Sequence, residues 1–240
     1  MFSFFQRKQK EIFPFHQLKT DVHAHLLPGI DDGSPDLSTS LHLMKSMIDL
    51  GFQHFTATPH VMQDIWKNSN ESITKAHSLL SAVLVENKIN YPLVAAAEYM
   101  VDENLEQLLK NKTPLRTIRD NWVLIEISFL QPPLQLNNIL FEMQLQGYQP
   151  ILAHPERYLY YANNLSDLVK LKDMGCKLQS NLLSFSGYYG KEVLRFAERM
   201  VDQQLISLLG TDLHHQRHLE GLKTLHYSKS LQKLMSRIEN

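Results

Sequence analysis

The sequence has a single cysteine, Cys176, in 240 residues, so an intramolecular disulfide is excluded. A disulfide-stabilised secreted scaffold is therefore not expected, and the lone thiol indicates a reducing compartment. No apolar run approaches the ~20 residues that a membrane-spanning helix needs, so we expect no stable membrane insertion. Near the N-terminus a short apolar patch (1–5) precedes the basic residues, which is the reverse of signal-peptide order. The sequence thus predicts a cytoplasmic protein.

An excess of charge of one sign is also missing, since 24 Lys and Arg oppose 25 Asp and Glu for a formal net charge of −1. Without a basic field we expect no nucleic-acid partner, and an anionic substrate would have to be attracted locally. Linkers and low-complexity segments are absent, and the length suits one large domain. We divide the chain into an N-terminal tail (1–17) and one domain (18–240). The sequence does not indicate the oligomeric state.

Short β-like runs alternate with helical stretches along the chain. The predicted strands are 19–25, 53–58, 92–98, 121–127, 149–154, 176–181 and 205–211. In the clearest helix we expect Ser34 as N-cap, Pro35 at the first helical position and Gly51 after the last turn. Further helices are expected over 69–87, from about 135 to Gly147, from about 166 to Gly175, and over 188–204. This alternation predicts an α/β fold with a parallel sheet, open or closed.

Side chains of metal-binding type follow almost every predicted strand. His23 and His25 alternate along the first strand and so share one face, and Asp32 follows nine residues after His23. The others are His60, Glu98, Glu126, His154, Asp212 and His214. Strand ends converge on one rim in a barrel, whereas an open sheet would spread these side chains too far apart to share a metal. The pattern therefore favours a barrel and predicts a metal site with nitrogen and oxygen ligands.

Seven segments in chain order carry a family resemblance. They are Asp-Val-His-Ala-His (21–25), Asp-Asp-Gly (31–33), Thr-Pro-His (58–60), Ala-Ala-Glu-Tyr (96–99), Leu-Ile-Glu-Ile-Ser (124–128), Ala-His-Pro-Glu-Arg-Tyr (153–158) and Thr-Asp-Leu-His (211–214). Through them the chain resembles the PHP (polymerase and histidinol phosphatase) superfamily. It is most similar to bacterial metal-dependent protein-tyrosine phosphatases encoded beside capsule and exopolysaccharide genes. The resemblance implies a distorted seven-stranded (β/α) TIM-like barrel, the PHP fold.

The resemblance also implies three divalent metal ions, with manganese preferred and iron or zinc as alternatives. The implied ligands are His23, His25, Glu98 and Asp212 for the first ion; Glu98, as a bridge, with Glu126 and His154 for the second; and Asp32, His60 and His214 for the third.

Two arginines follow the metal-type residues on the same loops. Arg157, three residues after His154, resembles the family's phosphate-binding arginine and is expected to act in catalysis and substrate binding. Arg217, three residues after His214, is a second candidate for both roles, although its spacing departs from that expected after Asp-x-His. His215 or His218 is an alternative in that loop, as a proton donor to the leaving oxygen. The second role therefore stays open.

The resemblance implies that metal-activated hydroxide hydrolyses phosphotyrosine on a protein, namely the tail of a bacterial tyrosine kinase that controls polysaccharide export. One alternative is a phosphatase for histidinol phosphate or another small phosphomonoester. A related barrel amidohydrolase, and a non-catalytic metal-binding or kinase-docking protein, are further alternatives. A cysteine-dependent mechanism is disfavoured because Leu182 stands six residues after Cys176, where that class has arginine. Tyr99, Phe129 and Tyr158 are candidates to line the approach of an aromatic substrate, and a place in the core is the equal alternative for each.

Overall fold

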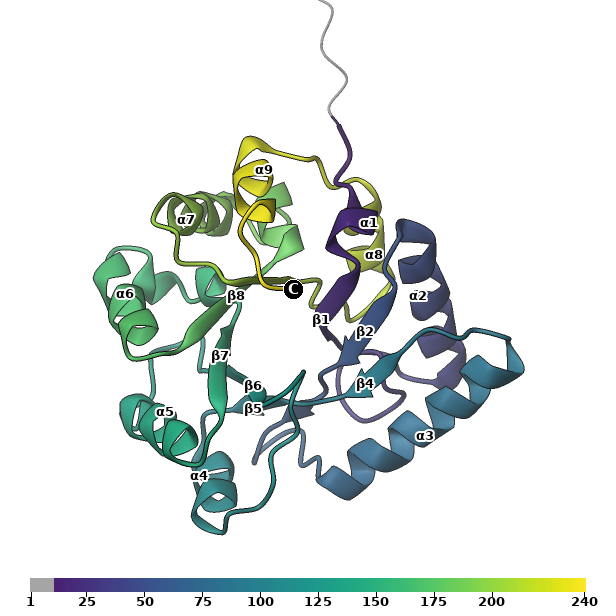
Figure 1. Ribbon diagram of the computed structural model, residues 1–240, viewed down its shortest axis with the longest axis horizontal. Helices are drawn as coiled ribbons and strands as arrows, with labels where there is room; N and C mark the ends of the chain where they lie inside the picture. Colours follow the sequence, from purple (N-terminus) through teal and green to yellow (C-terminus); the bar gives the residue numbers. More distant parts are fainter. Residues whose placement is uncertain (1–10) are drawn as a thin grey trace, which may run out of the picture.

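The computed structural model describes residues 11–240, so the apolar patch over 1–5 and most of the predicted tail lie outside the described residues. In Figure 1 the strands lie around a common centre and the helices lie outside them. The elements in chain order are α1 (Phe15–Leu18), β1 (Thr20–Ala24), α2 (Leu37–Leu50), β2 (His54–Ala57), β3 (His60–Val61), α3 (Asn70–Glu86), β4 (Leu93–Ala95), β5 (Glu98–Met100), α4 (Glu103–Lys110), β6 (Trp122–Glu126), α5 (Leu136–Leu145), β7 (Gln149–Ala153), η1 (Pro155–Arg157), η2 (Leu159–Tyr161), α6 (Leu165–Asp173), β8 (Lys177–Asn181), η3 (Leu182–Ser186), α7 (Lys191–Asp202), β9 (Leu208–Gly210), α8 (Gln216–Lys223) and α9 (Lys229–Met235).

The strands form two parallel sheets, one of order β1-β2-β4 and one of order β3-β5-β6-β7-β8-β9. The sheets adjoin on one side because β2 continues into β3 and β4 into β5 after short breaks. On the other side, the His25 N–H donates to the Leu213 carbonyl at 2.9 Å, beside a parallel bridge from Ala24 to Leu213. Seven strand positions therefore surround the centre. The predicted α/β, TIM-like fold is confirmed, and its distortion is the division of the wall into two sheets.

The two breaks correct the predicted strand ends. The run predicted as one strand over 92–98 is divided into β4 and β5, so Glu98 begins a strand segment instead of ending one. Pro59, which lacks an N–H for the ladder, lies at the break between β2 and β3. Its carbonyl accepts from the Glu98 N–H at 3.0 Å. The break therefore leaves His60 and Glu98 paired across the neighbouring strands.

The predicted start of α2 is wrong by two residues. Asp36, not Ser34, is the N-cap, and its carboxylate accepts from the Thr39 N–H at 2.7 Å. The backbone of Ser34 is instead held in the preceding loop, where its N–H donates to the His25 carbonyl at 3.1 Å. The predicted C-cap is confirmed, since Gly51 adopts a left-handed conformation with φ 112°.

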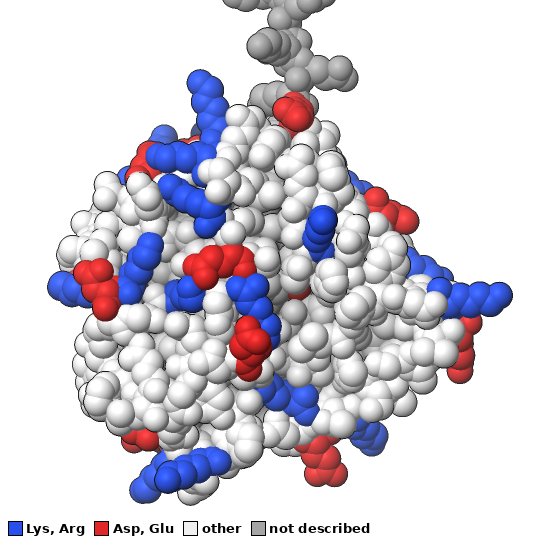
Figure 2. Space-filling model, viewed as in Figure 1, with Lys and Arg blue, Asp and Glu red and all other residues white. Residues whose placement is uncertain are grey.

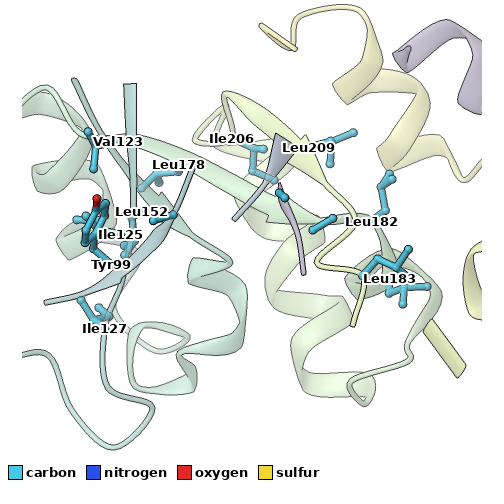
Figure 3. Packing of buried hydrophobic residues seen from close by; sticks show 14 of the residues in the cluster. Tyr99, Val123, Ile125, Ile127, Leu152, Leu178, Leu182, Leu183, Ile206 and Leu209 are labelled. Atoms are coloured by element: carbon cyan, nitrogen blue, oxygen red, sulfur yellow. The ribbon is translucent and has the colours of Figure 1, made fainter. Parts of the chain in front are cut away.

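Alternation along β6 separates an outer apolar layer from the interior of the ring. Val123, Ile125 and Ile127 belong to the large cluster beneath the helices, where they lie near Leu152 and Leu178 (Figure 3). The intervening residue Leu124 belongs to a second, smaller cluster with Val22, Ile151 and Leu208. Because side chains two residues apart share a face, the residue that follows Leu124 on the inner face is Glu126. The inner apolar cluster thus gives way to polar side chains toward the strand ends.

Residues within the predicted tail also pack on the domain. Phe13 and Phe15 are buried, and the ring of Phe13 lies 5.6 Å from that of Tyr227. The ring of Phe15 lies 5.5 Å from that of Phe52, next to α2.

On the face seen in Figure 2, basic and acidic side chains are interspersed. Among the residues described, no helix is long and apolar enough to cross a membrane.

Cys176 lies just before β8, where it is 2% exposed. Burial raises the pKa of its thiol to about 12. Because the thiolate is the reactive species, we expect the native protein to react with a thiol reagent at pH 8 more than about 100-fold slower than the unfolded chain. Absorbance of the released chromophore measures both rates. Fast, stoichiometric labelling of the folded protein would contradict this placement.

Candidate metal centre

All nine residues predicted as metal ligands lie together at one end of the ring of strands. Their ligand atoms form four overlapping groups, within each of which the atoms lie within 4.8 Å of one another. The groups are His25, Asp32, His60 and His214; His23, His154 and Asp212; His23, His25 and Glu98; and His60, Glu98 and Glu126. Glu98 also links to His154, whose Nε2 lies 3.0 Å from Glu98 Oε1. The convergence expected of a barrel rim is therefore present in the described residues.

The two histidines of the first strand are held with their Nε2 atoms facing each other. His23 Nδ1 donates to Gln179 Oε1 at 2.8 Å, and His25 Nδ1 donates to Asp31 Oδ2 at 2.8 Å. The two Nε2 atoms lie 3.3 Å apart. In neutral imidazoles with protonated Nδ1, both Nε2 atoms carry lone pairs, so a proton or a cation between them is needed to offset their repulsion at this distance. The outer contacts thus orient both rings as a metal ion between their Nε2 atoms would require.

Glu98 lies between the imidazoles with both carboxylate oxygens buried. Its Oε1 lies 3.5 Å from His23 Nε2, and its Oε2 lies 3.5 Å from His25 Nε2 and 3.1 Å from His60 Nδ1. Neither oxygen has a hydrogen-bond partner of acceptable geometry. A buried carboxylate without partners is strongly destabilising in a metal-free site. Glu98 therefore fits a carboxylate that bridges two cations.

Other buried atoms of the centre are also without hydrogen-bond partners, namely His60 Nδ1, Glu126 Oε1, His154 Nδ1 and Asp212 Oδ1. His60 Nδ1 approaches Glu126 Oε1 to 2.7 Å, yet the angles do not form a hydrogen bond. Donor and acceptor atoms that lie close together without forming hydrogen bonds to each other indicate a cation that they would bind in common. The nitrogen and oxygen donors of this set suit divalent transition metals, so the residues present fit metal ions.

The charges of the centre indicate the same conclusion. Burial, together with the charge of Glu98, raises the pKa of Glu126 to about 7. Burial lowers the pKa of His23, but the charges of Glu98 and Asp212 outweigh it and raise that pKa to about 9. Without metal the cluster therefore holds protons to offset its carboxylates. A divalent cation would replace these protons.

Two glycines allow the backbone to approach the first-strand histidines. A Cβ on Gly210 would lie 2.7 Å from His23 Cβ, and one on Gly33 would lie 2.4 Å from His25 Cβ. Both distances are shorter than any ordinary contact. At the strand ends, His154 and Asp212 adopt positive φ angles of 36° and 52°. Such strained conformations cluster at functional sites, where surrounding contacts hold them in place.

Several residues that support the ligands were missed by the sequence analysis. Gln179 orients His23, and its Nε2 donates to Asn181 Oδ1 at 3.0 Å; Asn181 Nδ2 in turn donates to Asp212 Oδ2 at 2.7 Å. Asp31 orients His25. A signal for the first pair is present, since Gln179 and Asn181 are polar and alternate along a predicted strand, on the same face. The strand over 176–181 was given no role because its end carries no histidine or carboxylate.

Arg157 lies at the edge of the centre. Its Nη1 donates to Asp212 Oδ2 at 2.9 Å, and its guanidinium carbon lies 4.9 Å from the Phe129 ring and 4.7 Å from the Tyr189 ring. It does not pair with the neighbouring Glu156. That buried carboxylate instead accepts hydrogen bonds from Ser180, Asn181 and Ser184.

A cavity of about 370 Å³ opens over the metal-type ligands. Arg157, His215 and His218 line it, whereas Arg217 is exposed in the first turn of α8 and is not among the lining residues. The role of Arg217 in catalysis and substrate binding stays a prediction. The cavity was also predicted to contain aromatic side chains.

Of the three aromatic candidates, Phe129 lines the cavity. The interpretation of Tyr99 and Tyr158 as lining residues is wrong. Both are buried in the core, where their hydroxyls accept from the N–H groups of Arg116 and Ile127. Met62, Ile65, Trp66 and Tyr189, which the sequence analysis did not single out, complete the wall.

Fold and site together define a TIM-barrel-like α/β protein with a histidine–carboxylate cluster that fits metal ions where its parallel strands end. A sequence profile of the capsular polysaccharide synthesis family CpsB/CapC matches residues 19–233. The chain belongs to this family.

The chain is similar to proteins described as tyrosine phosphatases. It is 30% identical to the tyrosine-protein phosphatase YwqE of Bacillus subtilis (strain 168), over 81% of this chain and 77% of that protein. It is 26% identical to the tyrosine-protein phosphatase CpsB of Streptococcus pneumoniae, over 81% of this chain and 82% of that protein.

Among solved structures, one from a study of YwqE and CpsB, described as unique metal-dependent tyrosine phosphatases, superposes with a TM-score of 0.79 at 27% identity. The superposition covers 90% of this chain and 86% of the chain in that structure. A histidinol phosphate phosphatase from Lactococcus lactis superposes with a TM-score of 0.55 at 13% identity, covering 93% of this chain and 99% of its own. The second likeness shows the fold alone.

Glu98→Gln tests the bridging carboxylate. The amide keeps the shape but removes the charge that two cations would share, so we expect metal affinity to fall by at least the ~10–100-fold typical of even outer contacts to a metal site. Elemental analysis after dialysis against a defined metal buffer measures the occupancy. Glu142→Gln, on the exposed face of α5, is the matched control and should keep the wild-type content. Equal occupancy in both variants, with both folded, would contradict the assignment of Glu98.

Metal binding is expected to depend on pH. In the metal-free protein His23 has a pKa of about 9, so below that pH a metal must displace its proton. Affinity should therefore rise with pH toward 9 and weaken about tenfold per unit for each proton displaced as the pH falls. Calorimetric titrations in two buffers of different ionisation enthalpy measure the protons released. An affinity independent of pH between 6 and 8, with no proton release, would refute the assignment.

Proposed function

We propose that this protein is a metal-dependent protein-tyrosine phosphatase. The single observation that carries the proposal is the cavity in which buried metal-type ligands, a clamped guanidinium and an aromatic wall meet. Its ligands fit cations, Arg157 fits a phosphate dianion, and Phe129 fits an aromatic ring. The similarity of the chain to YwqE and CpsB, which are described as tyrosine-protein phosphatases, supports the proposal.

We infer three divalent ions, with manganese preferred over iron or zinc. The family resemblance divides the ligands as given above, whereas the structure also groups His154 with His23 and Asp212, and His25 with the ligands implied for the third ion. The four overlapping ligand groups support more than one ion, and the nitrogen and oxygen donors suit all three metals. When bound, such ions activate water as a nucleophile and offset the charge of the phosphoryl group.

Arg157 binds and orients the phosphate in this proposal. Asp212 engages one arm of its guanidinium, and the side chain remains 27% exposed toward the cavity. The free N–H groups of the fork match the oxygens of a phosphate. Phe129 and Tyr189, which both contact the guanidinium, keep it from rotating away. The arginine is thereby held in place before a substrate arrives.

The apolar part of the cavity wall suits an aromatic ester. Phe129, 49% exposed, lies on one side, and Ile65, 69% exposed, projects from the loop between β3 and α3. That loop is closed by the Met62 N–H, which donates to the Trp66 carbonyl at 2.9 Å. A phenol leaving group, with a pKa of about 10, also needs less help from an acid than an alkyl alcohol.

We further propose a flexible tyrosine-bearing protein tail as substrate, that of a bacterial tyrosine kinase of polysaccharide export. An extended segment can reach a cavity at the rim without unfolding of either protein. A cytoplasmic location is part of the proposal, and the free thiol of Cys176 supports a reducing compartment.

Three substrates test the proposal: a phosphotyrosine peptide, a phosphoserine peptide and histidinol phosphate. We expect kcat/KM to favour phosphotyrosine at least tenfold, which corresponds to about 1.4 kcal/mol of transition-state binding. Activity should disappear with a chelator and return with Mn²⁺, and Cys176→Ser should keep it. A tenfold preference for histidinol phosphate would replace this proposal by the small-phosphomonoester alternative. If the metal-loaded protein is inactive on all three substrates, the result would favour a non-catalytic metal-binding or kinase-docking protein.

A further inference from the structure

A phosphate bound beside Arg157 has oxygens left to accept from a further donor on the cavity wall. Three equatorial oxygens carry the charge of a phosphoryl group in transfer, and one arm of the Arg157 guanidinium already donates to Asp212. Among the described residues that line the cavity, Arg157 is the one arginine or lysine. Arg217 lies exposed outside it. A neutral donor beside Arg157 would complete the phosphate contacts.

Tyr189 lies at the required place. It belongs to the short connection between η3 and α7, where Gly187 and Gly190 take positive φ angles of 79° and 100° and turn the chain. Its ring lies 4.7 Å from the Arg157 guanidinium carbon and, like Arg157, lines the cavity. The tyrosine and the arginine therefore face the same space over the metal-type ligands.

The hydroxyl of Tyr189 is buried and has no hydrogen-bond partner of good geometry in the described structure. The amide of Asn181 lies near; its Nδ2 donates one N–H to Asp212 and its Oδ1 accepts from Gln179, which leaves its second N–H facing the oxygen of Tyr189 and the hydroxyl proton of Tyr189 without an acceptor. Buried hydroxyls are normally paired, and an unpaired one at a cavity indicates a ligand. Burial, followed by the charge of Asp212, raises the pKa of Tyr189. The hydroxyl therefore keeps its proton and can donate it in a hydrogen bond.

We propose that Tyr189 is a further substrate-binding residue, whose Oη–H donates to a phosphate oxygen next to the Arg157 guanidinium. The hydroxyl supplies a donor within the cavity, whereas Arg217 lies outside it. This inference rests on the proposed function only in that the cavity receives a phosphate group. It does not depend on which ester is hydrolysed.

Tyr189→Phe tests the hydroxyl because it keeps the ring against Arg157. We expect the affinity of the metal-loaded protein for inorganic phosphate, measured by calorimetry, to fall about tenfold, as for loss of a hydrogen bond to a charged acceptor. The kcat/KM for an aryl phosphate should fall by a similar factor. Metal content and melting temperature should stay at the wild-type values, which separates a lost substrate contact from a structural defect.

Tyr188→Phe is the matched control, since Tyr188 is 41% exposed and its ring packs on His218. It should bind phosphate as the wild type does. Tyr189→Leu, which removes the ring as well, should lose more affinity than Tyr189→Phe. Wild-type phosphate affinity in Tyr189→Phe would overturn the proposal, and so would a loss that merely follows a loss of metal. A failure of the phosphotyrosine preference would leave the phosphate titration, and hence this inference, unaffected.

Discussion

The rest of the structure depends on one constraint. Acidic and imidazole side chains are buried together, and several of their polar atoms form no hydrogen bond. Glu98, at the centre, has two buried oxygens surrounded by imidazole nitrogens at 3.0–3.5 Å, and neither oxygen forms a hydrogen bond. Such an arrangement is unfavourable for an isolated protein chain and favourable around cations. The fold must therefore hold these side chains together, and without metal the protons of the cluster offset the charge of the carboxylates.

An outer layer of contacts does this. Gln179 and Asp31 fix the two imidazoles of β1, and Gly210 gives His23 the space that any Cβ would occupy. The same layer reaches the substrate side through Asp212, whose carboxylate accepts from Asn181 and from Arg157. The guanidinium that we propose to bind phosphate is thus tied to the candidate metal centre.

Much of the site could be predicted from the sequence because a strand has a period of two and a parallel barrel gathers its strand ends on one rim. Those two rules bring His23 and Glu126 to the same interior. They do not locate breaks within a strand, so Glu98 was placed at the end of the run 92–98, which the structure divides between β4 and β5. Local capping rules likewise chose Ser34, whose backbone bonds to His25 across the loop and leaves the cap to Asp36.

The sequence by itself determined the kind of chemistry, because residue type and alternation decide which side chains can bind a metal and on which face they lie. Only the tertiary structure decided which of the other side chains share the cavity. Phe129 lines it while Tyr158, equally aromatic, is fully buried in the core, and Arg217 lies outside although it is close in sequence to a ligand. Tyr189 faces Arg157 because two distant connections pack side by side. Such proximity depends on how strands and loops pack in three dimensions, and no local pattern encodes it.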